Sequence, residues 1–319
     1  MGGDHAPHAI IDGAIAAARS GIPVVLVGDS GVVRDRIEGI SNIGVIHSAE
    51  QIGMDDKPVE SIRKKSGASM LRAIELVKDG AAGAVVSCGN SGAFVVGAVL
   101  ELKTIHGVER PAIATVLPRG DGGRLVLLDA GANIDCRPEM LARFALLGVA
   151  MAQVLGVETP RVGVLSNGAE ETKGNALVQA ALPMIRELPI EVVGHMEPSE
   201  ALKGACDVLV CDGFMGNVLI KSAEGAVDTV LNLMRAEIKR SPSAKLGTFL
   251  LAGALRRFRK RVAWDAHGGG LLLGVNGVVV VGHGRANPAA VEASIRLAWM
   301  ASQHKLVARV QERFQKSSV

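Results

Sequence analysis

The sequence predicts an α/β fold: a three-layer α/β/α sandwich with a mostly parallel sheet. Short apolar runs of Val, Leu, Ile and Ala recur along the chain, and each is closed by Gly, Ser, Asn or Asp. Unbroken apolar strands are typical of sheets covered by helices on both faces. The runs alternate with helix-length segments, which favours the sandwich. Many of the 39 glycines fall at the ends of the runs, which indicates tight, ligand-facing turns.

The predicted strands lie within residues 23–29, 83–90, 111–118, 124–133, 161–168, 207–214 and 277–284. The segment 124–133 follows the turn Pro-Arg-Gly-Asp-Gly-Gly, so it is predicted as the second strand of an antiparallel hairpin. Helices are predicted over 69–78, 138–155, 174–187 and 288–312. Two of these begin at a proline, which the first turn of a helix tolerates.

A helical hairpin is predicted to project from the sheet, over about residues 230–263 of a single domain that spans 1–319. One long helix covers 214–240, Ser241-Pro242-Ser243 breaks it, and a second helix covers 246–262. Nine basic residues and one acid between Met234 and Val262 give this arm a net charge of +8, whereas the whole chain carries +3. Such a patch indicates an anionic partner: a lipid surface, an acidic protein or nucleic acid.

The second arm helix places apolar residues beside basic ones, which leaves two interpretations open. The helix either packs on a partner subunit or presses an apolar tip into an anionic membrane, and the two are compatible. The residues concerned are Leu246, Phe249, Leu250, Leu251, Arg256, Arg257, Arg259 and Lys260.

Composition and missing motifs exclude several classes of protein and of binding site. The four cysteines form no C-x-x-C pair, and neither a membrane span nor a signal peptide is evident, so reduced thiols and a cytoplasmic location are expected. Histidines and cysteines lack metal-ligand spacing. A dinucleotide fingerprint, a P-loop and G-x-S-x-G are absent. We therefore expect no metal and no cofactor.

The residues just after each apolar run are the candidate site, because ligands of open α/β sheets bind outside the carboxyl ends of strands. Asn90, Ser91 and Gly92 end a strand and open a helix, so backbone N–H groups there would converge on an anion such as phosphate. The alternative is an ordinary helix N-cap, with Ser91 capping its own helix. Lys173 follows another strand end, where a cation opposes the helix dipole; it either binds phosphate or is a solvated surface residue.

Other polar residues follow further strands. Asp212 ends one strand, and Asn217 lies in the next turn; N-capping is the alternative role for Asp212. His267 and His283 flank a Gly-rich segment, and either is suited to proton transfer, although a single histidine is usually structural. Asp4 and His5 are candidates of the same kind.

Together these segments resemble the acyl carrier protein-dependent phosphate acyltransferases of bacterial phospholipid synthesis. The matching stretches are MGGDHAP (1–7), VVSCGNSGA (85–93), LLDAGANIDCRPE (127–139), VGVLSNGAEETKGN (162–175), DVLVCDGFMGNVLIKSAEG (207–225) and LLGVNGVVVVGHG (272–284). They cover nearly the whole chain in order. The chain departs from the pattern at its start, because relatives usually carry a short apolar strand before the equivalent of Met1.

The resemblance implies a phosphotransacetylase or isocitrate dehydrogenase-like fold and transfer of a long acyl group from acyl carrier protein to inorganic phosphate. It also implies a homodimer, peripheral membrane association and delivery to a glycerol-3-phosphate acyltransferase, with no role for nucleic acid. The rivals are a coenzyme A-dependent phosphotransacetylase and a non-enzymatic membrane scaffold.

For this reaction we expect direct attack of phosphate on the thioester. The residues are then assigned as follows: Asn90, Ser91, Gly92 and Lys173 bind phosphate; Lys173, Asp212, His267 and Asn217 form the catalytic set; Asn133, His283, Asp4 and His5 orient substrate.

Overall fold

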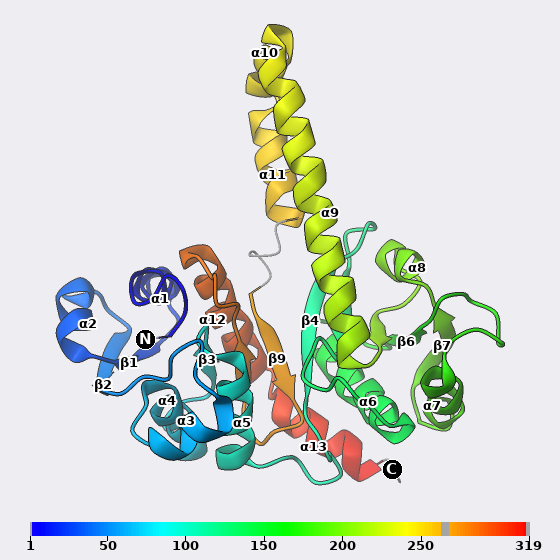
Figure 1. The fold of residues 1–319 in the computed structure, drawn as a ribbon, viewed down its shortest axis with the longest axis horizontal. Coiled ribbons are helices and arrows are strands. Elements are labelled where there is room, and N and C mark those ends of the chain that lie inside the picture. Colours follow the sequence, from blue (N-terminus) through cyan, green and yellow to red (C-terminus); the bar gives the residue numbers. More distant parts are fainter. Residues whose placement is uncertain (1, 263–267, 317–319) are drawn as a thin grey trace.

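The computed structural model describes residues 2–262 and 268–316. In them, helices flank an eight-stranded sheet, and a separate two-stranded sheet lies beside it (Figure 1). The strands are β1 (Val24–Gly28), β2 (Ile43–His47), β3 (Val85–Ser87), β4 (Ala112–Pro118), β5 (Arg124–Leu128), β6 (Arg161–Leu165), β7 (Glu191–Met196), β8 (Val208–Val210), β9 (Gly270–Leu273) and β10 (Val279–Val281).

The helices cover the sheets and build the arm. They are α1 (His8–Arg19), α2 (Ser30–Ile37), α3 (Pro58–Lys64), α4 (Ser69–Lys78), α5 (Ser91–Leu102), α6 (Pro138–Val154), α7 (Ala176–Arg186), α8 (Pro198–Lys203), α9 (Gly213–Arg240), α10 (Pro242–Leu250), α11 (Ala252–Val262), α12 (Pro288–Gln303) and α13 (Leu306–Lys316).

The large sheet has the strand order β3-β10-β9-β4-β5-β8-β6-β7. β3 and β10 are parallel at one end, and β5, β8, β6 and β7 are parallel at the other. In the centre, β10–β9, β9–β4 and β4–β5 are antiparallel, which confirms the predicted hairpin. Strand direction therefore reverses three times between β10 and β5, so these two strands run in opposite directions. The carboxyl ends of β3 and β10 therefore lie at the edge of the sheet opposite to those of β5, β8 and β6.

Side chains alternate between two apolar layers, as both faces of the sheet are covered. Val280 packs in the layer of α6, α12 and α13, whereas its neighbours Val279 and Val281 pack with α4 and α5. In β5, Val126 and Leu128 face the first layer, and Leu125 and Leu127 face the other. The three-layer sandwich predicted from the apolar runs is therefore confirmed.

Most predicted helices end within two residues of their predicted bounds, but two segments differ. The segment 288–312 forms two helices because Lys305 takes a left-handed backbone conformation, with φ of 53°. After the long α9, the next helix begins at Pro242 rather than at residue 246. The Ser241 side chain caps it by accepting a hydrogen bond from the Ala244 N–H at 3.2 Å. The arm itself projects from the sheet as predicted (Figure 1).

Asp207 ties together the amino ends of β6 and β8. Its carboxylate accepts hydrogen bonds from Arg119 Nη1 at 2.5 Å and from Arg161 Nε at 3.0 Å, and the residue is only 6% exposed. Burial alone would raise the pKa of Asp207, but the hydrogen bonds from Arg161 and Arg119 outweigh it, so its pKa is lowered. A lowered pKa stabilises the fold above the ordinary value of 3.8, and that stabilisation is lost as the pH falls through the lowered value.

We therefore expect Asp207→Asn to lower the free energy of unfolding by about 3 kcal/mol at neutral pH, since it removes the buried carboxylate that pairs with Arg161 and Arg119 and leaves Arg119 with Asp121 alone. The difference from wild type should shrink as the pH falls below the ordinary value of 3.8, where the unfolded carboxylate takes up a proton, and should be lost as the pH falls through the lowered pKa of the native carboxylate. Urea unfolding at several pH values measures this. A difference that stays constant between neutral and acidic pH contradicts it.

Candidate functional site

The predicted site residues fall into two groups at opposite edges of the sheet. The first group follows β3 and β10, and it contains Asn90, Ser91, Gly92, His283, Asp4 and His5. The Asp4 N–H donates to the carbonyl oxygen of Gly284 at 2.8 Å, which holds the start of the chain against the end of β10. The second group follows β5, β8 and β6, and it contains Asn133, Asp212, Asn217 and Lys173.

The Asn90 side chain forms hydrogen bonds with the protein backbone through both its nitrogen and its oxygen. Its Nδ2 donates to the carbonyl oxygens of Gly53, Met54 and Asp56 at 3.1, 3.1 and 2.9 Å, and its Oδ1 accepts from the Ala93 N–H at 3.0 Å. The residue is 7% exposed. Its side chain thus caps α5, a role that the alternative interpretation of the sequence gives to Ser91, and it fixes the loop 53–56 against that helix.

The other members of the first group are accessible. Ser91 and Gly92 form the exposed first turn of α5. His283 is exposed, and its Nδ1 lies 3.1 Å from the Arg285 backbone nitrogen, from which it accepts a hydrogen bond. The Arg285 guanidinium lies 3.9 Å from the Asp4 carboxylate. This edge therefore combines a helix N-terminus with an imidazole and a guanidinium, groups that suit an anion.

In the second group, the fully buried Asp129 organises the loop after β5. Its carboxylate accepts hydrogen bonds from five donors: the backbone N–H groups of Ile113, Gly131, Ala132 and Asn133, at 2.6 to 3.1 Å, and Asn133 Nδ2 at 2.8 Å. Asn133 Nδ2 also donates to the Pro111 carbonyl oxygen at 2.9 Å, and Asn133 is 5% exposed. The hydrogen bonds of the Asn133 side chain thus stabilise the loop after β5.

The start of α9 is pressed onto that loop. The Gly213 N–H donates to the Asn133 carbonyl oxygen at 2.7 Å. A Cβ on Gly216 would lie 1.9 Å from the Asp129 carbonyl oxygen, so only glycine permits this approach. The Asp212 side chain caps the helix by accepting from the Met215 N–H at 2.9 Å. Asp212 therefore fills the N-cap role that the sequence left open, and it also lines a pocket.

That pocket has a volume of about 630 Å³ and lies at the ends of β6 and β8. Its lining is mostly apolar, with polar groups at the strand ends: Leu141, Leu165, Ser166, Asn167, Gly174, Asn175, Val178, Pro198, Cys211, Asp212, Met215, Val218, Leu219 and Ser222. Lys173 precedes two of these residues, and a Cβ on Gly168 would lie 2.7 Å from Lys173 Cγ. In the part of the chain that the structure describes, Lys173 forms no ion pair.

Two buried polar atoms near this pocket were missed from the sequence. Ser166 Oγ and His195 Nδ1 have no hydrogen-bond partner among the described residues. Ser166 lines the pocket, and a Cβ on Gly174 would lie 3.5 Å from His195 Cε1. Ser166 was one polar residue among many at strand ends, and His195 lies in β7, which the apolar runs did not predict.

One face of α9 connects the two groups. Asn217, Lys221 and Glu224 are spaced so that they share a helix face. A Cβ on Gly131 would lie 3.6 Å from Asn217 Cβ, at the second group. Burial raises the pKa of Glu224, while the charge of His283, in the first group, acts to lower it. Asn217 and Glu224 are seven residues apart, which is about 10 Å along the helix.

The site offers no thiolate nucleophile. All four cysteines are free, as predicted, and burial raises the pKa of Cys88 and of Cys136 to about 11. No group of His, Cys, Asp and Glu suited to a metal ion occurs within the described ranges. His267, predicted to be catalytic, lies outside the described residues. The remaining polar groups can bind and orient an anion beside an apolar pocket.

Comparisons with known proteins place the chain in a family. Residues 1–309 match the model of the family described as fatty acid synthesis protein. The phosphate acyltransferase of Citrifermentans bemidjiense is 45% identical over 305 residues, which cover 93% of this chain and 86% of that protein. The phosphate acyltransferase of Heliobacterium modesticaldum is 42% identical over 319 residues, covering 98% and 95%.

Solved structures support the fold. The EutD phosphotransacetylase from Staphylococcus aureus matches with a TM-score of 0.61 and 18% identity, over 93% of this chain and 91% of that one. The 4-hydroxythreonine-4-phosphate dehydrogenase from Klebsiella pneumoniae matches with a TM-score of 0.58 and 17% identity, over 93% and 95%. The phosphotransacetylase-like α/β fold is thus confirmed. With the family match and the phosphate acyltransferase relatives, the chain belongs to the fatty acid synthesis protein family, as its strand-end motifs predicted.

Proposed function

We propose that this protein transfers a fatty acyl group from acyl carrier protein to inorganic phosphate, giving acyl phosphate for phospholipid synthesis. The observation that carries the proposal is that Lys173 directly precedes Gly174 and Asn175, which line a mostly apolar pocket with polar groups at the strand ends. An ammonium group attracts phosphate, and the apolar lining suits an acyl chain. Both reactants are thereby brought to one edge of the sheet, and the names of the relatives agree with this reaction.

In the proposed reaction, a phosphate oxygen attacks the thioester carbonyl carbon. The new C–O bond forms, the C–S bond breaks, and the electron pair leaves on the sulfur as a thiolate. Lys173 holds the phosphate, and Asn217 orients the thioester from α9. Asp212 and Asn133 act as positioning residues, because their side chains fix the start of that helix and its loop. Holding reactants in line can contribute about 7–11 kcal/mol to such a step.

The first group is proposed to contact the rest of the donor. One of its members, His283, acts electrostatically on Glu224, which lies two turns beyond Asn217 on the same face of α9. Ser91, Gly92, His283, Asp4 and His5 are open to a ligand there, whereas Asn90 holds their loop in place. His267 stays a predicted catalytic residue.

The reaction is tested by acyl phosphate formation from thioesters of acyl carrier protein and of coenzyme A, each with and without phosphate. We expect phosphate-dependent product with a clear preference for the long-chain carrier-protein donor. A preference for acetyl coenzyme A would instead support a phosphotransacetylase. If no donor gives phosphate-dependent turnover, the result would support the non-enzymatic membrane scaffold.

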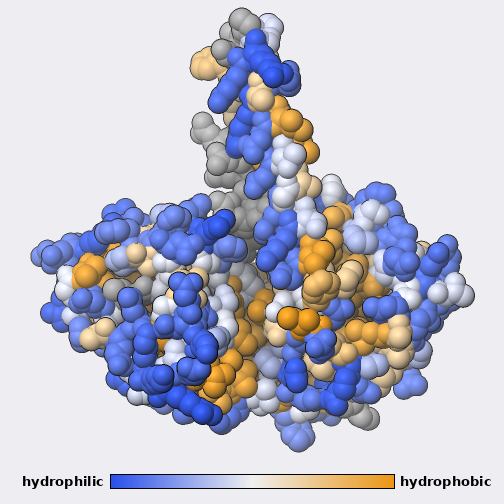
Figure 2. Space-filling model, viewed as in Figure 1, coloured by the Kyte–Doolittle hydropathy of each residue, from blue (hydrophilic) through white to orange (hydrophobic). Residues whose placement is uncertain are grey.

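The arm is proposed to attach the cytoplasmic enzyme to an anionic membrane, where a glycerol-3-phosphate acyltransferase would use its product. Figure 2 shows apolar and strongly hydrophilic surface side by side along the arm. Phe249, Leu250 and Leu251, where α10 meets α11, are 78%, 76% and 58% exposed, and the basic Arg257 is exposed nearby. No described helix is both long and apolar enough to span a bilayer. The side chains of Leu246, Arg256, Arg259 and Lys260 lie outside the described residues.

Membrane attachment predicts that Leu251→Asp weakens binding to anionic vesicles by about tenfold or more, because a leucine contributes about 1.5–3 kcal/mol when it leaves water. Flotation with phosphatidylglycerol vesicles measures this. Val59→Asp, at an exposed apolar residue of α3, is the matched control and should bind like wild type. If both variants float like wild type, the arm serves only a partner subunit, the homodimer being the other proposed use of this surface.

A further inference from the structure

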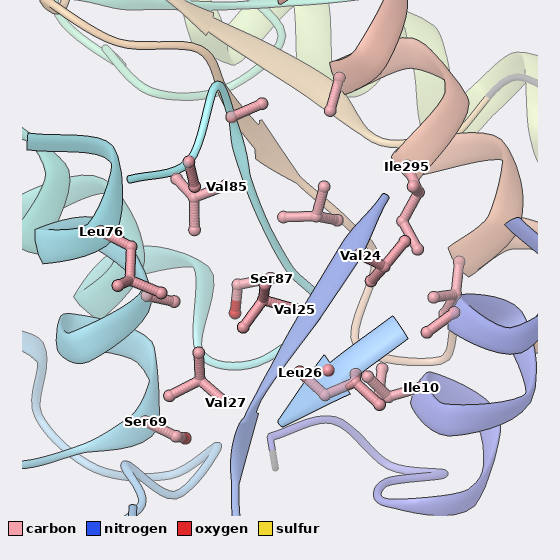
Figure 3. A pocket seen from close by; sticks show the side chains of 18 of the residues that line it. Ile10, Val24, Val25, Leu26, Val27, Ser69, Leu76, Val85, Ser87 and Ile295 are labelled. Atoms are coloured by element: carbon pink, nitrogen blue, oxygen red, sulfur yellow. The ribbon is translucent and has the colours of Figure 1, made fainter. Parts of the chain in front are cut away.

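Two cavities of the molecule differ in the polar groups that line them. The cavity shown in Figure 3, of about 530 Å³, is lined mostly by apolar side chains such as Leu76 and Ile295. No Asp, Glu, Lys, Arg or His is among its described lining residues, so an anion there would lose its hydration without gaining a charged partner. The pocket at the ends of β6 and β8 differs, because the buried hydroxyl of Ser166 lines it without a hydrogen-bond partner among the described residues.

A second buried atom without a partner in the described structure, His195 Nδ1, lies on the same face of the sheet as the Ser166 side chain. His195 in β7 is paired with Val164 in β6. The ladder continues past Val164, because the Ser166 N–H donates to the Met196 carbonyl oxygen at 3.0 Å. Side chains two residues apart on a strand share a face, so Ser166, Val164 and His195 lie on one face. Ser166 is 8% exposed and His195 is 6% exposed, so both polar groups are removed from bulk water.

The start of α7 lies over this face and adds hydrogen-bond donors. A Cβ on Gly174 would lie 3.5 Å from His195 Cε1, and the φ of Gly174 is 90°, a conformation that favours glycine. The Asn175 side chain caps the helix by accepting from the Val178 N–H at 3.0 Å. The two N–H groups before that of Val178 have no acceptor in the described part of the chain. Because Gly174 and Asn175 line the pocket, the positive end of the helix dipole lies there as well.

The spacing of the two side chains fits one tetrahedral oxyanion. Strands lie about 4.8 Å apart and rise about 3.3 Å per residue, so residues offset by two positions on neighbouring parallel strands are about 8 Å apart. A group that contacts both side chains must therefore present oxygen atoms in two directions. Hydrogen phosphate does this, and because it has acceptor oxygens as well as an O–H group, it satisfies the Ser166 hydroxyl and either tautomer of His195. Lys173, which directly precedes Gly174, supplies the opposite charge.

We propose that Ser166 and His195 bind the acceptor phosphate beneath the start of α7. The Ser166 hydroxyl donates to one phosphate oxygen, His195 Nδ1 forms a hydrogen bond with a second, and the first-turn N–H groups of α7 donate to the others. This inference rests on the proposed function, because the ligand is the phosphate of that reaction. Bound there, the phosphate borders the apolar lining that is proposed to hold the acyl chain.

Steady-state kinetics test the assignment with phosphate and the acyl carrier protein thioester varied separately, since the phosphopantetheine arm of the donor also carries a phosphate group. Ser166→Ala should raise KM for phosphate by about 10- to 100-fold, because a hydrogen bond to a charged ligand is lost. KM for the donor should stay unchanged, and Ser166→Thr, which keeps the hydroxyl, should recover most of the loss. Ser199→Ala, at an exposed serine of α8, is the matched control and should behave like wild type. A rise in the donor KM alone would overturn the assignment in favour of the phosphopantetheine phosphate.

Direct binding provides a readout that needs no turnover. Calorimetric titration of the full chain with inorganic phosphate, in the absence of a thioester, should show a Kd that is about 10-fold or more weaker in Ser166→Ala and in His195→Leu. His195→Asn places a polar atom at nearly the same distance from Cβ as Nδ1, so it should bind phosphate more tightly than His195→Leu. The Tm of Ser166→Ala without phosphate should stay close to that of wild type, because Ser166 Oγ has no partner among the described residues to lose.

The outcomes separate this site from the reaction. If no thioester gives turnover but phosphate binding still depends on Ser166 and His195, the site is supported although the proposed reaction fails. If turnover depends on phosphate, yet both variants keep the wild-type KM and Kd for phosphate, the site is overturned and the reaction stands. A buried water would then satisfy the two atoms. Should Ser166→Ala fail to fold, His195→Leu and His195→Asn decide in the same way.

Discussion

Asp129→Ala is expected to lower the free energy of unfolding by about 3–5 kcal/mol and to abolish acyl transfer. The carboxylate is fully buried and satisfies five N–H donors at once. Alanine accepts none of these bonds, and each buried donor left without an acceptor costs about 1–3 kcal/mol before relaxation. Since the same loop seats the start of α9, loss of the carboxylate also displaces Asn217 from the proposed site.

Chemical denaturation and the acyl phosphate assay measure the two effects. Asp135→Ala is the matched control, because Asp135 is an exposed aspartate of the same loop. It should change the free energy of unfolding by less than about 0.5 kcal/mol. If Asp129→Ala unfolds like wild type, the loop finds other acceptors and Asp129 is not its organiser.

Local features of the site could be predicted because they depend on nearby residues. The place of Asp212 before a helix predicts an N-cap as its alternative role, and its side chain caps the backbone N–H three residues ahead. The start of α5 is also capped, by Asn90 rather than by the neighbouring Ser91. The β4–β5 hairpin followed from a glycine-rich turn between two apolar runs. In each case the partner atoms lie within a few residues, so the sequence pattern contains the contact.

The division of the site into two edges could not be predicted, because strand direction depends on distant pairing. β9 is an apolar run like the others, yet it lies antiparallel between β10 and β4, and β4 precedes it by about 160 residues. Its insertion places Ser91 and Lys173 at opposite edges. The three carbonyl groups that accept hydrogen bonds from Asn90 lie 34 to 37 residues away, so the local sequence does not predict that this side chain binds the protein backbone.

The division has a consequence for the phosphate ligands. β3 and β6 are six steps apart in the sheet, or about 29 Å at the usual spacing of about 4.8 Å. One phosphate ion is far smaller than this distance, so Ser91 and Lys173 do not bind the same ion in this arrangement. The apolar pocket lies beside Lys173, and the acyl group and its acceptor must meet. We therefore propose that phosphate binding depends on Lys173.

Lys173→Ala is accordingly expected to reduce kcat/KM for phosphate by about 100- to 1000-fold, the usual effect of removing one donor that stabilises developing charge. The Tm should change little, because Lys173 forms no ion pair in the described structure. Lys203→Ala, at an exposed lysine paired with Glu200, is the matched control and should keep wild-type activity. Initial rates over a range of phosphate concentrations measure both variants.

The kinetic pattern then identifies what Lys173 does. A raised KM for phosphate with unchanged kcat means that the ammonium binds phosphate equally in the ground and transition states. Equal loss in kcat and kcat/KM means that it acts only as negative charge develops on the thioester oxygen. Lys173→Arg retains the charge but not its geometry, so it should recover more of a binding defect than of a transition-state defect. Activity within about twofold of wild type in Lys173→Ala would remove this residue from the site and transfer phosphate binding to the first turn of α5.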